Sequence, residues 1–244
     1  REQNPVSFVS FFDAMRFTTW LHNGQGSGDT ESGVYTIGSG IDEVRSADAQ
    51  YFIPTLDEWH KAAFYDPSLN GGSGGYHLYP TQSDERPYSD NPGSLNTPDD
   101  TNVINGKWDD EIDNGYNGGF AVSGTNVSTI DLTTNPLTDV GAYALSVSAY
   151  GTFDQAGNVN EWNEDVTLTG VPFIPDGRGI SGGSWSGDTD RFTRADGNTG
   201  FDGPLGQQAG YGFRVAAVVP EPSTGLLGSI AACALLSTLR RNRR

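Results

Sequence analysis

The side chains that most often carry catalysis or bind metals are scarce in this sequence. Cys233 is the only cysteine and lies in an apolar segment, so the preceding chain has no disulfide, no thiolate nucleophile and no cysteine-based metal site. The three histidines, His22, His60 and His77, lack the paired spacing of a metal-binding helix. Serines are plentiful, but none lies in a GxSxG turn that would expose a nucleophile. The histidines are therefore predicted to be surface or packing residues.

Composition favours a turn-rich fold. The 244 residues include 33 glycines and 13 prolines, and only 18% are charged, a balance that disfavours a helix bundle and suits short strands. Before Pro220 there are 30 acidic and 10 basic residues, a net charge of −20. The chain before Pro220, called the body below, would repel nucleic acid and anionic lipid. The acidity has two open interpretations: a need for divalent cations, or the solubility of an exported protein.

Two helices are expected to position the core. In the first, Ser10 is the predicted N-cap with Asp13 as its capping-box partner, and Asn23-Gly24 ends the element. Its apolar positions recur at helical spacing, at Phe11, Ala14, Met15, Thr18 and Leu21.

The second expected helix has a stronger start signal. Thr55 and Glu58 form a capping box, and Pro67 is the predicted stop. One face is formed by Leu56, Trp59 and Ala63. Residues 70–140 are mostly turn chemistry, and residues 139–218 contain short apolar pairs between Gly, Asn and Asp, as in brief strands joined by loops. No internal repeat or interdomain linker precedes Pro220, so we expect one compact domain.

Three ordered segments resemble a known family. They are PVSFVSFFDAMRFTTWL, FIPTLDEWHKAAFYDP, and VGAYALSVSAYGTFDQAGNVNEWNED with the later ISGGSWSGD and GYGFRVA. Together they resemble the formylglycine-generating enzyme family, or sulfatase-modifying-factor domain, over nearly all of residues 4–217. The resemblance implies an α+β fold, a variant of the C-type lectin-like fold with little regular secondary structure, over residues 1–219. Arg1 stands where a methionine would begin a chain, so we expect N-terminal sequence to be missing, including any signal peptide.

The family's catalytic cysteines have no counterpart here. In catalytic members a cysteine pair after the GGS turn binds copper and oxidises a sulfatase cysteine to formylglycine. With that turn on residues 182–184, the two positions are Gly187 and Phe192. Neither side chain can form a thiolate or bind a soft metal, so no copper is expected. Other polar residues could line the same cleft or pair with each other, namely Asp188, Asp190, Arg191 and Arg194.

The resemblance also implies a structural calcium site in the loop DQAGNVNEW. Residue by residue, Asp154 and Glu161 would supply carboxylates, and Gly157 and Val159 backbone carbonyls, which suits the oxygen-rich cage that Ca²⁺ prefers. The alternative is a hydrogen-bonded Asx turn with Glu161 paired to an arginine. Arg214, in the family's GFR strand, is expected to tie loops together. The family's second calcium site would fall near Asn102, Val103, Asn114 and Tyr116, where the spacing departs from the pattern.

The C-terminal segment, residues 220–244, has three parts. Pro220-Glu221-Pro222 is a rigid breaker. Residues 225–239 form an apolar run that would span about 22 Å as a helix, short of the roughly 30 Å hydrocarbon core and suited to a temporary anchor. Four arginines follow, which predicts a cytoplasmic C-terminus with the body outside: Arg240, Arg241, Arg243 and Arg244. A buried core helix is the alternative, which those arginines disfavour.

This ending resembles the PEP-CTERM sorting signal of bacteria that make extracellular polysaccharide. The resemblance implies that an exosortase, a membrane cysteine protease, cleaves near Pro220-Glu221-Pro222. Cys233 would then leave with residues 220–244, called the tail below. The combined expectation is an exported protein, anchored transiently in the inner membrane and then placed at the cell surface or in the extracellular matrix. It would be a non-catalytic binding or matrix protein whose partner is an extracellular glycan or envelope protein. The competing hypothesis is an enzyme with rebuilt chemistry in the same cleft.

Overall fold

The structure is a computed structural model that describes residues 2–84, 137, 139–141, 147–170, 176–184, 194–197 and 199–218. Several predictions concern residues outside these ranges. They are Gly187 and Phe192, which the resemblance assigns to the catalytic cysteine positions, the neighbouring Asp188, Asp190 and Arg191, the region around Asn102, Val103, Asn114 and Tyr116, and the tail 220–244. Within the described ranges, no helix is long and apolar enough to cross a membrane.

The first helix, α1 (Phe11–His22), forms where its capping signals lie. The Ser10 hydroxyl accepts from the Asp13 amide at 3.2 Å, and an Asp13 carboxylate oxygen accepts from the Ser10 amide at 2.8 Å. This reciprocal pair satisfies amide groups that the first turn leaves without helical partners. The helix ends at the predicted Asn23 cap, and its buried face is Phe11, Ala14, Met15, Thr18 and Thr19.

The second helix, α2 (Leu56–Phe64), has the predicted Thr55–Glu58 capping box but ends earlier than expected. Pro67 is not its stop. The chain turns extended at Tyr65, because Tyr65 and Asp66 form β2 (Tyr65–Asp66), which pairs antiparallel with β3 (Gly75–Tyr76) after the short α3 (Leu69–Gly72). A tertiary strand pairing thus ends the helix before the proline does.

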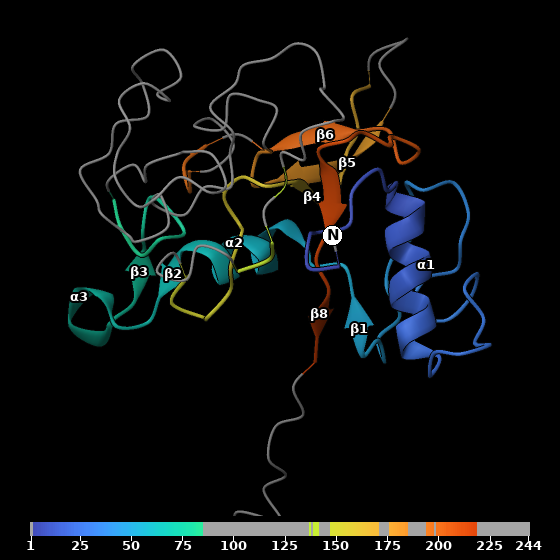
Figure 1. The fold of residues 1–244 in the computed structure, drawn as a ribbon, viewed down its shortest axis with the longest axis horizontal. Coiled ribbons are helices and arrows are strands. Elements are labelled where there is room, and N and C mark those ends of the chain that lie inside the picture. Colours follow the sequence, from blue (N-terminus) through green and yellow to red (C-terminus); the bar gives the residue numbers. More distant parts are fainter. Residues whose placement is uncertain are drawn as a thin grey trace, which may run out of the picture.

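A mixed four-stranded sheet forms the other half of the described fold. Its order is β6-β5-β4-β7, with β4 antiparallel to β5, β5 antiparallel to β6, and β4 parallel to β7. The strands are β4 (Asn160–Thr167), β5 (Gly177–Ser181), β6 (Gly200–Asp202) and β7 (Tyr211–Phe213). A separate pair joins β1 (Tyr51–Phe52) to β8 (Ala216–Ala217). Figure 1 places α1 at one side of the described fold and α3 with β2 and β3 at the other.

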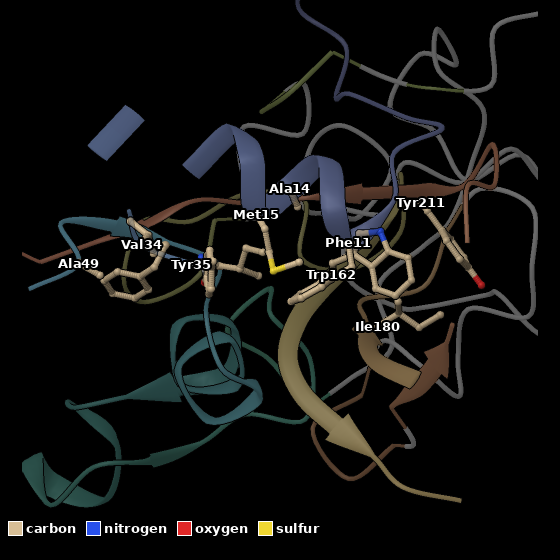
Figure 2. Packing of buried hydrophobic residues seen from close by; sticks show 11 residues of the cluster. Phe11, Ala14, Met15, Val34, Tyr35, Ala49, Trp162, Ile180 and Tyr211 are labelled. Carbon is tan, nitrogen blue, oxygen red and sulfur yellow. Dashed lines mark hydrogen bonds between the residues drawn. The ribbon is translucent and has the colours of Figure 1, made fainter. Parts of the chain in front are cut away.

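The main core joins α1 to the sheet. Trp162 of β4 is fully buried, packs edge-on against Phe11 and Tyr211, and donates its indole N–H to the Val9 carbonyl at 3.0 Å. Figure 2 shows the cluster as a row of side chains from Ala49 to Tyr211. Its members are Phe11, Ala14, Met15, Val34, Tyr35, Ala49, Phe52, Ile53, Trp162, Ile180 and Tyr211. The few helices, short strands and long connections agree with the expected fold.

Candidate functional site: the loop entering β4

The loop that precedes β4 curls tightly and is fixed to two neighbouring elements. Asp154, Gly157 and Asn158 all have positive φ angles, of 58°, 86° and 60°. Such left-handed backbone turns the chain sharply, and glycine adopts it without steric cost. The Gly157 amide donates to the Gly182 carbonyl at 2.7 Å, and the buried Gln155 side-chain amide donates to the Trp59 carbonyl at 3.1 Å. The loop is therefore held between α2 and the turn after β5.

Glu161, at the end of this loop, is buried and heavily bonded. Its Oε1 accepts from Arg214 Nη2 at 2.6 Å, and its Oε2 accepts from Arg214 Nε and from Trp59 Nε1, the latter at 2.6 Å. Arg214 Nη2 also donates to the Phe153 carbonyl at 3.0 Å. Arg214 thus ties strand and loop together, as predicted, through a bidentate ion pair. The arginine pairing of Glu161 that the sequence left open is present.

Asp154, at the start of the loop, is a second carboxylate in the same environment. Its Oδ2 accepts from the Gly141 amide at 2.7 Å. Burial raises the pKa of Asp154, and the charge of Glu161 raises it further, whereas the Gly141 bond and Arg214 act in the opposite direction. Two carboxylates and one guanidinium leave a net negative charge in this loop, which a cation would offset.

The chemistry of these side chains is compatible with a calcium ion. The loop has a carboxylate at each end, Asp154 and Glu161, and calcium takes six to eight oxygen ligands in a flexible cage. A carboxylate oxygen has two lone pairs. Oε2 of Glu161 already accepts two hydrogen bonds, so Oε1, which accepts only from Arg214, is the oxygen that could also face a metal. Within the described ranges, no three His, Cys, Asp or Glu side chains gather as a metal cluster. A site here would therefore depend on the backbone carbonyls of Gly157 and Val159.

The turn that precedes the former cysteine positions packs against this loop. Gly182 has φ 93°, and a Cβ at this position would lie 3.1 Å from the Gln155 carbonyl oxygen and 3.3 Å from the Trp59 ring. A side chain here would force the loop or α2 to move. Beyond the turn, Arg194 pairs with Asp196 through two bonds of 2.9 Å. The predicted pairing of Arg194 with Asp188 or Asp190 falls on residues outside the described ranges.

The three histidines have structural partners, as predicted. His22 Nδ1 accepts from the Gln50 amide at 3.2 Å, and His60 Nε2 lies 2.9 Å from the Ala195 carbonyl oxygen. His77 Nε2 lies 3.3 Å from Asp66 Oδ2. Each imidazole thus joins segments of the fold, and none lies beside the loop carboxylates.

Sequence reasoning missed a second structural arginine, which is buried. Arg178 of β5 is 2% exposed and donates at 2.8 Å to the carbonyls of Gly40, Ile41 and Glu43. Its guanidinium lies 4.5 Å from the Phe11 ring centroid and 3.6 Å from a Glu43 carboxylate oxygen. It fixes the 40–43 segment to the sheet. A single arginine between two glycines carries no local signal of this role.

The comparison with known families identifies the class of this chain. The sulfatase-modifying factor enzyme 1-like domain matches residues 1–219. The chain belongs to this family, which confirms the resemblance drawn from the three motif segments. No curated protein matches the chain.

Three solved structures are similar to it at low identity. Variable protein 1 of Treponema denticola is 19% identical, with 88% of this chain and 71% of that one covered and a TM-score of 0.48. CarF is also 19% identical, with coverages of 89% and 69% and a TM-score of 0.45. PvdO from Pseudomonas aeruginosa is 18% identical, with coverages of 89% and 63% and a TM-score of 0.44. At these values none of the three informs the function of this chain.

Proposed function

We propose that this chain is an exported, non-catalytic binding or matrix protein built on a sulfatase-modifying-factor scaffold. One feature supports the proposal: the family resemblance assigns Gly187 and Phe192 to the positions where catalytic members have their copper-binding cysteines. Copper(I) needs soft thiolate ligands, and neither residue supplies one. A scaffold retained without its reactive pair favours recognition over oxidation.

The bonding of the reactive side chains supports the same proposal. Among the described residues, the imidazoles of His22, His60 and His77 contact backbone or carboxylate groups of neighbouring segments. A general base needs to reach a substrate proton, and these rings instead join parts of the fold.

The proposed ligand is an extracellular glycan or an envelope protein of the polysaccharide layer. The acidic body, with a net charge of −20 before Pro220, disfavours nucleic acid as a partner. The lectin-like character of the fold supports a glycan by analogy.

Binding and oxidation can be tested side by side. The chain is applied to a glycan array and used in a pull-down from envelope extract, while oxygen uptake is followed with a sulfatase-motif peptide and copper. A catalytic member of the family serves as the positive control. We expect selective retention of one glycan or envelope protein and no oxygen uptake. Oxidation of the peptide cysteine would overturn the proposal.

A structural calcium ion in the loop is the second part of the proposal. Asp154 and Glu161 would hold it through their carboxylates, and Gly157 and Val159 through their carbonyls. The ion would add positive charge between two carboxylates that repel each other. Its contribution would be to stability, since it binds the folded loop.

The third part concerns the tail. Residues 220–244 would act as a PEP-CTERM sorting signal, with residues 225–239 as a transient anchor in the inner membrane. An exosortase would cleave near Pro220 and release or transfer the body to the cell surface or matrix. The apolar run followed by four arginines supports this orientation.

A further inference from the structure

The last described strand is bonded to the body almost up to the proposed processing site. In the β1–β8 pair, Tyr51 lies opposite Ala217 and Phe52 opposite Ala216. The Val218 amide then donates to the Gln50 carbonyl at 3.1 Å. The Gln50 amide in turn donates to His22 at the end of α1. In Figure 1, β8 runs beside β1 at the point where the described chain ends.

The distance left for a protease is short. Pro220 follows Val218 by two residues, so it lies at most about 7 Å from the last bonded residue along the chain. The apolar run begins at residue 225, at most about 25 Å from Val218. A membrane-embedded protease that acts near Pro220 must therefore approach the β1–β8 end of the body.

Proteases and other peptide-binding proteins take extended segments and bond to their backbone groups. The backbone of residues 216–218, just before Pro220, is already paired with β1 and with Gln50. We propose that the processing protease meets the body at the β1–β8 pair and cleaves only after the Val218 end of β8 has left Gln50. This inference rests on the proposed processing of the tail.

The arrangement limits how far the strand opens. Val218 is 58% exposed and Tyr51 39% exposed, whereas Phe52 is 7% exposed and belongs to the main core. Exposed terminal bonds open at low free energy, while core strands open only with the global fold. Ala217 and Val218 therefore detach readily, but release of Ala216 would uncover Phe52.

The cleavage itself is peptide-bond hydrolysis. The protease thiolate adds to a carbonyl carbon near Pro220, and the amide nitrogen leaves, protonated, as the new amino terminus of the tail. Water then releases the body from the thioester with a free carboxylate. No oxidant or reductant is needed.

The test uses the full chain in a host that makes a matching exosortase, with the processed fraction followed by pulse-chase. Val218→Pro removes the amide that donates to Gln50 and keeps an extended backbone. It should raise the processing rate about fivefold, because the open fraction rises with the loss of one hydrogen bond. A Gly-Ser-Gly-Ser spacer between Val219 and Pro220 should raise the rate at least as much, by adding about 13 Å of free chain.

Ile180→Val is the matched control, because it loosens the main core within β5 and leaves the β1–β8 pair intact. It should be processed at the parent's rate. If Val218→Pro and the spacer variant are both processed at the parent's rate, or if Ile180→Val is accelerated as much as Val218→Pro, the inference is wrong while processing stands. A parent chain that is never processed would overturn the proposed function as well.

Discussion

At the residue scale, two arginines hold this fold together: Arg178 is buried, Arg214 is half-buried, and each contacts a carboxylate. Arg214 binds both oxygens of Glu161. Arg178 donates to four backbone carbonyls, including that of Glu43, whose carboxylate lies 3.6 Å away. Arginine suits both places because its guanidinium stays charged and presents donors in a fixed plane. Glu161, one of the predicted calcium ligands, thus has a structural role of its own. Its removal would test two effects at once, so the calcium prediction needs a different residue.

Asp154→Asn separates the calcium site from the ion pair. The amide oxygen can still accept from Gly141, and the Arg214–Glu161 pair is untouched. In the parent, excess calcium should raise the melting temperature, since a hundredfold excess over the dissociation constant adds about 2.7 kcal/mol to the free energy of unfolding. We expect Asp154→Asn to lose most of this shift and to melt with chelator at or above the parent's temperature, because burial raises the pKa of Asp154 and disfavours its charge.

Asp139→Asn is the control for that melt. Asp139 is exposed and accepts from Asn4, so it carries the same charge close to the loop without being a predicted ligand. It should keep the full calcium shift. If chelator leaves the melting temperature of the parent unchanged, the prediction of a structural calcium ion is wrong.

Arg178→Met should be among the most damaging single changes in the body. It keeps much of the side-chain volume but leaves four backbone carbonyls and the Glu43 carboxylate without the guanidinium. Breaking a buried pair on one side typically costs about 3–5 kcal/mol. Urea unfolding measures the loss. Arg16→Met removes an exposed pair with Glu31 and should cost about 1 kcal/mol or less; equal losses for the two variants would contradict the structural role of Arg178.

At the element scale, α2 is the support on which the candidate site rests. Its Trp59 donates to Glu161 from the side chain and accepts from Gln155 at the backbone. The start of this helix depends on local bonds between Thr55 and Glu58. Loss of the capping bonds at the start of α2 should therefore also weaken the support that Trp59 gives to Glu161 and Gln155.

Thr55→Ala should lower the free energy of unfolding by about 1 kcal/mol, the usual loss for an N-cap side chain. Ser68→Ala is a fitting control, because Ser68 is the N-cap residue of α3 and its side chain makes no capping bond. Chemical denaturation of both variants should show the larger loss for Thr55→Ala, because the Ser68 side chain bonds to Asp66 and not to a helix amide. A similar loss at Ser68 would mean that the effect is not capping.

The same elements explain what could be predicted from the sequence. Both capping boxes join residues three positions apart, so the start of α1 and of α2 could be read from the chain. The early end of α2 depends on pairing between Tyr65 and Tyr76, across a turn whose strands are only two residues long. At the site, the family resemblance identifies the Asp154–Glu161 loop. The Trp59–Glu161 and Arg178–Gly40 hydrogen bonds each join residues more than a hundred positions apart, and the sequence does not predict them. Local patterns carry no record of such contacts.

At the scale of the whole molecule, the body and the tail have opposite characters. The body carries −20 before Pro220, and the tail carries an apolar run and four arginines. Under the proposed sorting of the tail, these opposite characters would favour its separation from the body.

Intact-mass analysis of the exported protein checks this separation. In a host with the matching exosortase, the mature chain should lack everything beyond the Pro220 region, including Cys233 and the terminal arginines. In a host whose exosortase is inactivated, the chain should keep its tail and remain with the membrane fraction. Finding Arg244 on the mature exported form would contradict the sorting prediction.

The burial of Trp162 between Phe11 and Tyr211 also bears on the order of events during synthesis. The core needs α1 from the start of the chain and β7 from near residue 211, and such long-range contacts form late because loop closure must precede them. The β1–β8 pair adds the same requirement for residues 216 and 217. A growing chain therefore has little stable structure until almost all of residues 1–218 have been made. The apolar run begins at residue 225, seven positions later. Under the proposed sorting, the tail would therefore be made directly after the last strand that the core needs.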